Sequence, residues 1–84
     1  MNIEFSAASF EDYQYWQQQD RKKLHKINQF LQEISRTPFR GIGKPEALRG
    51  DLQGYWSRRI DREHRLVYRV LDGEIQVLAC RYHY

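Results

Sequence analysis

The feature that most constrains the fold is the Asp72-Gly73 pair, which lies between two runs rich in aromatic and β-branched residues. A pair of this kind is a strong signal for a two-residue hairpin turn. Arg65 to Leu71 and Glu74 to Tyr82 are therefore predicted to be two antiparallel strands. A similar run, Tyr55 to Asp61, predicts a third strand just before them.

Alternation of side chains along these strands predicts two different sheet faces. On the middle strand, the apolar face carries Leu66, Tyr68 and Val70, and the half-basic face carries Arg65, Val67 and Arg69. The last strand is expected to place Ile75, Val77, Ala79, Arg81 and His83 on one side and Leu78, Cys80, Tyr82 and Tyr84 on the other. We expect helices to cover the apolar face and to leave the basic face exposed.

A short strand, Asn2 to Phe5, and two helices are predicted ahead of this sheet. Ser6 or Ser9 can cap the first helix, and Asp20 can cap the second. The apolar stripes that indicate these helices are Phe10, Tyr13 and Trp16, then Leu24, Ile27, Phe30, Leu31 and Ile34. The second helix is expected to end at Thr37 and Pro38, because the residue before a proline is pushed out of helical dihedral angles.

The segment between the second helix and the third strand, Phe39 to Gly54, is rich in glycine and is predicted to be an irregular loop. It is long for a compact domain, and such loops often carry function. Together the elements predict one α+β domain over residues 1–84, with an N-terminal strand and a helical hairpin packed on an antiparallel β-sheet. A chain of 84 residues excludes a multidomain protein.

Positive charge is concentrated in the middle of the chain. Residues 36–69 carry nine Lys and Arg side chains against four Asp and Glu, a net charge of +5, whereas the whole chain has +3. Eight of the nine cations are arginines, whose planar fork suits phosphate groups. The pattern is typical of a protein with an anionic partner, and a solvated strand face would show the same composition.

The single cysteine, Cys80, excludes an intramolecular disulfide and any multi-cysteine metal site. His25, His64 and His83 are widely separated, so no metal cluster is expected. No run approaches the about 18 apolar residues of a membrane-spanning helix, and Met1 to Ser6 lacks the pattern of a secretion signal. We expect a cytoplasmic protein without a cofactor and without membrane association.

The remaining polar residues suit proton transfer at phosphate: Glu46 in the loop, arginines on the sheet, and His83 with Tyr84 at the end. In RNA cleavage the substrate's own 2′-hydroxyl is the nucleophile. The protein must supply a base, an acid for the leaving 5′-oxygen, and cations for the phosphorane charge. By position alone, a loop glutamate is most often a solvated surface residue, and a penultimate histidine often belongs to a frayed tail.

Residues along the whole chain are arranged as in one known family. They comprise Ser9, Asp12, Tyr13, Trp16 and Asp20, then Gly41, Gly43 to Glu46 and Leu48, then Leu52, Gly54, Trp56 to Ile60 and Glu63 to Tyr68, and finally Arg81 to Tyr84. On these residues the sequence resembles the YoeB toxins of the RelE superfamily. The resemblance implies a RelE-like microbial-ribonuclease fold and a toxin that cuts mRNA in the ribosomal A site.

The resemblance also implies roles for individual residues. Glu46 corresponds to the general base, His83 to the general acid, Arg65 to the cation that stabilises the transition state, and Tyr84 to a residue that orients or supports the terminus. Lys44, Arg49 and Arg59 are expected to contact RNA. No metal or cofactor is expected to take part.

The implied partners are a Phd/YefM-type antitoxin, a second copy of the toxin, and the ribosome with its mRNA and rRNA. Operator DNA is expected to be bound only through the antitoxin complex. Two other interpretations stay open from the residues: a non-catalytic RNA- or ribosome-binding module, and a DNA-binding regulator. The regulator is less favoured, because the second helix is occupied by core residues and the cations cluster in strands.

Overall fold

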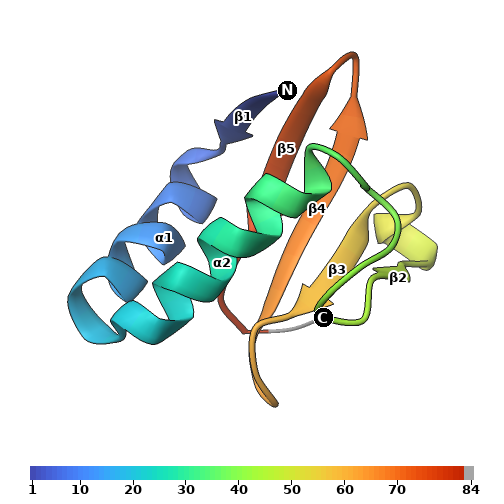
Figure 1. The fold of residues 1–84 in the computed structure, drawn as a ribbon. Coiled ribbons are helices and arrows are strands. Elements are labelled where there is room, and N and C mark those ends of the chain that lie inside the picture. Colours follow the sequence, from blue (N-terminus) through green and yellow to red (C-terminus); the bar gives the residue numbers. More distant parts are fainter. Residues whose placement is uncertain (83–84) are drawn as a thin grey trace.

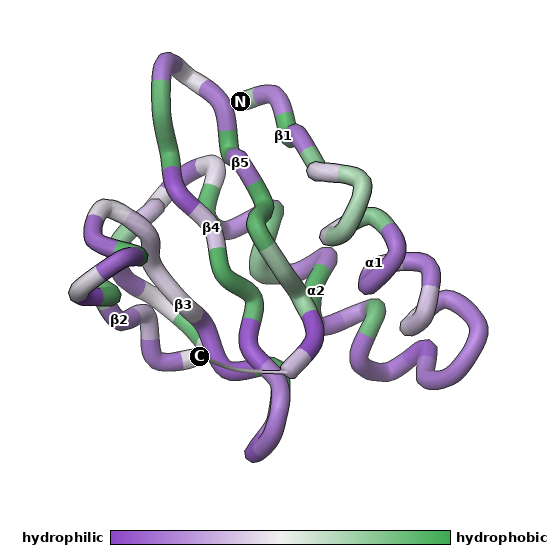
Figure 2. Tube along the Cα trace, turned by 180° about the vertical axis from the view of Figure 1, so that it is seen from behind, coloured by the Kyte–Doolittle hydropathy of each residue, from purple (hydrophilic) through white to green (hydrophobic). Residues whose placement is uncertain are grey.

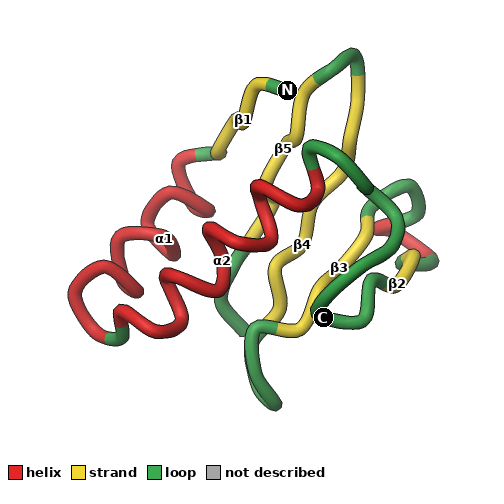
Figure 3. Tube along the Cα trace, viewed as in Figure 1, coloured by secondary structure: helices red, strands yellow, loops and turns green. Residues whose placement is uncertain are grey.

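The computed structural model describes residues 1–82 of the chain. Its elements follow in the order β1 (Asn2–Phe5), α1 (Ala7–Gln19), α2 (Arg21–Ile34), β2 (Glu46–Ala47), a short 3₁₀ helix η1 (Gly50–Leu52), β3 (Trp56–Arg59), β4 (Arg65–Leu71) and β5 (Glu74–Ala79). Figure 1 shows the two helices as a hairpin lying on one face of the sheet. Figure 3 shows the long loop after α2 crossing to the edge formed by β2.

The five strands form one sheet in the order β1-β5-β4-β3-β2. The last four strands of the chain pair antiparallel, whereas β1 pairs parallel with β5. The predicted α+β class, with a helical hairpin packed on a sheet, is confirmed, but the sheet is mixed and not wholly antiparallel. Parallel pairing requires a long connection between the two strands, and here both helices and three strands intervene.

The hairpin predicted around Asp72-Gly73 is present. These residues have φ of 51° and 74°, the left-handed conformation that a two-residue turn between antiparallel strands requires. β4 has the predicted bounds, whereas β5 ends at Ala79 and not at Tyr82. It ends early because the next backbone N–H, that of Cys80, donates to the Asp12 carboxylate of α1 (3.1 Å).

The segment predicted as an irregular loop contains two short elements, β2 and η1. β2 adds an edge strand to β3, and a pairing of two residues is too brief to leave a pattern in the sequence. β3 is shorter than predicted, ending at Arg59 and not at Asp61. The backbone N–H groups of Ile60 and Asp61 instead donate to the His64 carbonyl oxygen, which closes the turn to β4.

Both helices begin at side-chain caps. Ser6 caps α1, because its Oγ accepts the Ser9 N–H (3.1 Å), and Ser9 itself is buried within the helix. Asp20 ends α1 and caps α2, since its Oδ1 accepts the N–H groups of Lys22 and Lys23 (3.1 and 3.3 Å). A single aspartate between the helices therefore sets the tight turn of the hairpin.

The core lies between the helices and the sheet. Of the aromatic stripe predicted on α1, only Trp16 is fully buried, and Phe10 is 48% exposed. Cys80 is buried as predicted, and this burial raises the pKa of its thiol to about 12. The other buried core residues come from α2, the end of β3, β4 and β5: Ile27, Phe30, Leu31, Ile34, Ile60, Leu66, Tyr68, Ile75 and Val77.

Figure 2 shows the same division from behind, with hydrophobic residues along β4 and β5 and hydrophilic residues in the turns. No helix within residues 1–82 is long and apolar enough to cross a membrane. The buried apolar residues of the core join the helices to the sheet.

One arginine of the basic segment lies in the core. Arg58 of β3 is fully buried, and its guanidinium forms an ion pair with the Glu33 carboxylate of α2. It also donates to the carbonyl oxygens of Thr37 (2.9 Å), Arg40 (3.0 Å) and Ile42 (3.3 Å). Residues 36–69 therefore present less positive charge on the surface than their net charge of +5 indicates, because Arg58 is buried and paired with Glu33.

Glu33 joins the buried arginine to the loop. Its carboxylate accepts the N–H of Ile42 (2.8 Å) in addition to the Arg58 guanidinium. Burial acts to raise the pKa of Glu33, but the hydrogen bonds from Arg58 and Ile42 outweigh it, and the pKa lies below its ordinary value. The loop after α2 is thus attached to both the helix and β3.

Replacing Arg58 with methionine is expected to lower the free energy of unfolding by about 3 kcal/mol, because an ion pair and the donors to three carbonyl oxygens are lost. Urea unfolding measures the change. Arg62→Met, which removes an exposed arginine, is the control and should have an effect below about 0.5 kcal/mol. A loss below about 1 kcal/mol for Arg58→Met would contradict the role assigned to this residue.

Candidate active site

A hollow of about 150 Å³ opens on the sheet face that is turned away from the helices. Ser57, Arg59, Arg65 and Val67 line it, and they alternate along β3 and β4 with residues that point into the core. The loop and β2 complete the lining with Lys44, Glu46 and Leu48. This is the face that the sequence predicts to be basic and exposed.

Among the described residues that line the hollow, Glu46 is the one with a carboxylate. The register of β2 places it opposite Ser57 of β3, so its position depends on the short edge strand. The side chain is exposed, and it takes part in none of the ion pairs found within residues 1–82. A carboxylate without a cationic partner is available to accept a proton.

The hollow is lined by three cations and, among the described residues, one carboxylate, so its net charge is positive. Arg59 and Arg65 are directly opposite one another on β3 and β4, an arrangement in which like charges repel. In the described part of the chain, no carboxylate forms an ion pair with either arginine or with Lys44. The positive potential of this face is therefore left to attract an anionic ligand.

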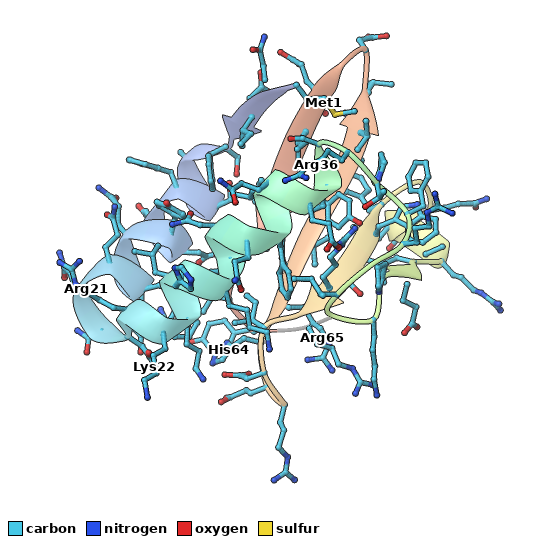
Figure 4. All side chains as sticks on the ribbon, viewed as in Figure 1. Met1, Arg21, Lys22, Arg36, His64 and Arg65 are labelled. Carbon is cyan, nitrogen blue, oxygen red and sulfur yellow. The ribbon has the colours of Figure 1, made fainter. Side chains whose placement is uncertain are left out.

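Arg65 is held in place by backbone groups. Its Nη1 donates to the carbonyl oxygens of Asp61 (2.9 Å) and His64 (3.1 Å). Carbonyl oxygens orient a guanidinium without cancelling its charge, so the cation is both positioned and available. Figure 4 shows Arg65 and His64 at the end of the sheet where the chain passes from β3 to β4.

The turn that carries Arg65 is built on Asp61. Its carboxylate accepts the N–H groups of Glu63 (2.8 Å) and His64 (2.7 Å) and pairs with Lys23 of α2 (2.9 Å). Burial acts to raise the pKa of Asp61, but the hydrogen bonds from Lys23, His64 and Glu63 outweigh it and lower the pKa to about 2. The Asp61 carboxylate thus stabilises the turn and connects it to α2 of the helical hairpin.

Lys44 reaches the hollow because the loop passes close to the core just before it. Gly43 has φ of +81°, and a Cβ at this position would lie 2.6 Å from the Phe30 ring. The Gly43 carbonyl oxygen accepts the N–H of Arg59 (2.7 Å). Glycine is therefore required here, both for its conformation and for the close approach.

The structure brings four of the predicted site residues together: Lys44, Glu46, Arg59 and Arg65. Arg49 does not line the hollow; it is exposed and precedes η1. His83 and Tyr84 lie outside the described residues. Within residues 1–82, no group of three or more His, Cys, Asp or Glu side chains is placed to hold a metal ion.

Sequence reasoning missed several contributors to this site. Ser57 has the pattern of an ordinary strand residue, and only the pairing of β2 with β3 places it beside Glu46. Asp61 was assigned to the end of a strand, whereas it builds the turn that presents Arg65. An aspartate shortly before a second strand is a turn signal, and it is the clue that was available.

The arrangement fits a phosphate ligand that has a hydroxyl group nearby. The three cations can hold the phosphate and stabilise additional negative charge on it. The free carboxylate can take a proton from the hydroxyl. Two of the three requirements of phosphodiester cleavage by a neighbouring hydroxyl, a base and cations, can thus be met by the described residues of one hollow.

The chain is similar to known proteins along its whole length. Residues 5–84 match the family model of the YoeB-like toxin of bacterial type II toxin-antitoxin systems. Toxin YoeB of Escherichia coli (strain K12) and Toxin YoeB of Streptomyces coelicolor are each 51% identical to the chain over 84 residues, which is 100% of both proteins compared.

Solved structures agree with this match. The YoeB/ParE toxin from Agrobacterium tumefaciens has a TM-score of 0.96 at 48% identity and covers 100% of both chains. A YoeB-YefM complex and a YoeB dimer, both from Staphylococcus aureus, give TM-scores of 0.93 and 0.94 at 53% and 54% identity, over 100% of this chain and 98% of theirs. The predicted RelE-like fold is confirmed.

The stability of the protein is expected to fall as the pH drops from about 4 to about 2. A carboxyl whose pKa is lowered by folding contributes stability above its unfolded value, here 3.8, and loses it as the pH falls through the folded value of about 2. Asp61→Asn keeps an oxygen for the turn but removes the charge, so its profile should be flatter. Part of the dependence of stability on pH should remain in this variant, because the pKa of Glu33 is also lowered.

Thermal unfolding between pH 2 and pH 5 measures this effect. Asp51→Asn, at an exposed aspartate of η1, is the matched control and should retain the slope of the unmodified protein. A profile of Asp61→Asn that runs parallel to that of the unmodified protein would show that Asp61 does not tie the turn to α2.

Proposed function

Because the chain belongs to the YoeB-like toxins of bacterial type II toxin-antitoxin systems, we propose that it is a ribosome-dependent endoribonuclease that cuts mRNA in the A site and so inhibits translation. The observation that best supports this function is the hollow in which Glu46 is accompanied by Lys44, Arg59 and Arg65. The proposed reaction is attack of the substrate's 2′-hydroxyl on the adjacent phosphorus.

The described residues have distinct roles in this reaction. Glu46 takes the proton of the 2′-hydroxyl, the 2′-oxygen bonds to phosphorus, and the bond to the 5′-oxygen breaks. Arg65 stabilises the negative charge that builds up on the phosphorane, and its two hydrogen bonds to carbonyl oxygens hold it in place beforehand. Lys44 and Arg59 hold the neighbouring phosphates of the strand.

The remaining assignments come from the family resemblance. His83 is the general acid that protonates the 5′-oxygen, a role suited to a side chain that exchanges protons near neutral pH. Tyr84 orients or supports the end of the chain. Arg49, exposed at the start of η1, contacts a phosphate of rRNA or mRNA. The products have a 5′-hydroxyl and a 2′,3′-cyclic phosphate or 3′-phosphate.

The partners follow from the same family. Relatives were solved as a YoeB-YefM complex and as a YoeB dimer, which supports a Phd/YefM-type antitoxin and a homodimer for this chain. An acidic segment that folds on binding suits the basic sheet face and would keep it from RNA until needed. The toxin acts in the cytoplasm on the ribosome, and operator DNA is bound only through the antitoxin complex.

Glu46→Ala and His83→Ala are each expected to lower the rate of mRNA cutting in a translation extract at least about 100-fold, since general acid and base groups contribute factors of this size. Mapping of mRNA 5′ ends measures the cutting. Co-sedimentation with ribosomes should change little, because the arginines that hold phosphate remain. Glu11→Ala and His25→Ala, at exposed helix positions, are the matched controls.

Two results would contradict the proposal. If both variants cut mRNA at the wild-type rate, neither Glu46 nor His83 takes part in the reaction. Ribosome binding without any cutting by the wild-type protein would favour a non-catalytic RNA- or ribosome-binding module. Product ends give a further check, since only the proposed enzyme leaves a cyclic or 3′-phosphate end.

A further inference from the structure

Directly beyond β5, at Cys80, the chain is held by side chains of α1. The Cys80 N–H donates to Asp12 Oδ2 (3.1 Å), and the Cys80 carbonyl oxygen accepts from Trp16 Nε1 (2.7 Å). Both partners belong to α1. The path of the segment that leads to the end of the chain is therefore set by contacts remote in sequence.

The next contacts come from the start of β4. The Tyr82 N–H donates to His64 Nδ1 (2.7 Å), and the Tyr82 carbonyl oxygen accepts the N–H of Arg65 (2.8 Å). Tyr82 has φ of 64°, a left-handed conformation that costs energy for a residue other than glycine. Two consecutive residues thus hold both backbone polar groups of Tyr82 in a strained conformation.

The His64 ring has a fixed orientation. It is 9% exposed and packs edge-on against Trp16, with ring centroids 4.8 Å apart and an interplanar angle of 82°. The ring also packs against the Tyr82 ring, with centroids 5.6 Å apart, and the backbone N–H of His64 donates to Asp61 Oδ1 (2.7 Å). Because Nδ1 accepts a hydrogen bond, the neutral ring carries its proton on Nε2.

We infer that His64 is a positioning residue for the reaction: its Nδ1 accepts from the backbone N–H of Tyr82 and fixes the residue that immediately precedes His83. The inference rests on the proposed function, in which His83 is the general acid. Arg65 lines the hollow, and its backbone N–H donates to the carbonyl oxygen of the same residue, Tyr82. One pair of adjacent residues, His64 and Arg65, therefore contributes the catalytic cation and holds the backbone of the residue before the acid.

Removal of the Nδ1 acceptor should misplace the acid without weakening substrate binding. His64→Leu keeps an apolar group against Trp16 but cannot accept from Tyr82. It is expected to lower kcat on the order of 100-fold, the loss that a displacement of about 1 Å can cause, with KM for programmed ribosomes unchanged. His64→Asn keeps an acceptor near the position of Nδ1 and should recover much of the rate.

A change of leaving group distinguishes a residue that positions the acid from a residue with a purely structural role. In a synthetic mRNA whose scissile 5′-oxygen is replaced by sulfur, the phosphorus–sulfur bond breaks and a thiolate departs. A thiolate needs no proton from the protein, because thiols are far stronger acids than alcohols. His64→Leu and His83→Ala should both cut this mRNA at rates within about threefold of wild type.

For each variant, the quantity to compare is the ratio of its cutting rate on the sulfur-substituted mRNA to its cutting rate on ordinary mRNA. This ratio does not depend on the fraction of protein that is folded, so partial unfolding of a variant does not obscure it. His25→Leu, at an exposed histidine of α2, is the control and should show the wild-type ratio. Wild-type kcat for His64→Leu, equal losses on both mRNAs, or no recovery with His64→Asn would each overturn the inference. Failure of the proposed function is seen separately, as cutting of ordinary mRNA by His83→Ala at the wild-type rate.

Discussion

The buried guanidinium of Arg58 is the interaction on which the candidate site depends. A fully buried cation is tolerated only when it is paired and its N–H groups are bonded. Arg58 meets both conditions through Glu33, three loop carbonyl oxygens and the Tyr68 hydroxyl, which in turn donates to Pro38. These carbonyl groups belong to a segment without strand partners, so the course of the loop is set by an arginine of the sheet.

Two sets of contacts then assemble the proposed machinery from different directions. The loop held by Arg58 continues through Gly43 into β2, and the pairing of β2 with β3 presents Glu46. The turn built on Asp61 presents Arg65, and the Tyr82 segment is bonded to that same turn. A small domain can therefore place the proposed base and the proposed cation on one sheet face, because both are fixed by buried or backbone hydrogen bonds.

Features that depend on neighbours in sequence were predictable: the β4–β5 hairpin, both helices and the Asp20 cap. The burial of Arg58 was not, because it has the same local pattern as the exposed Arg59 beside it, and its partner Glu33 is 25 residues away. β2 escaped prediction for the same reason, since its pairing is short and non-local. The roles proposed for Glu46 and Arg65 rest on the family resemblance. Their positions in the sequence do not indicate that both line one hollow, which only the structure shows.

The central claim is that the mRNA supplies its own nucleophile and the hollow supplies the base and the charge. The most direct test replaces one 2′-hydroxyl, on the 5′ side of the scissile bond, by hydrogen in an mRNA bound to ribosomes. We expect that the wild-type protein no longer cuts this mRNA, although it still binds the programmed ribosome and still cuts the all-ribose mRNA. Undiminished cutting of the deoxy-substituted mRNA would exclude attack by the 2′-hydroxyl.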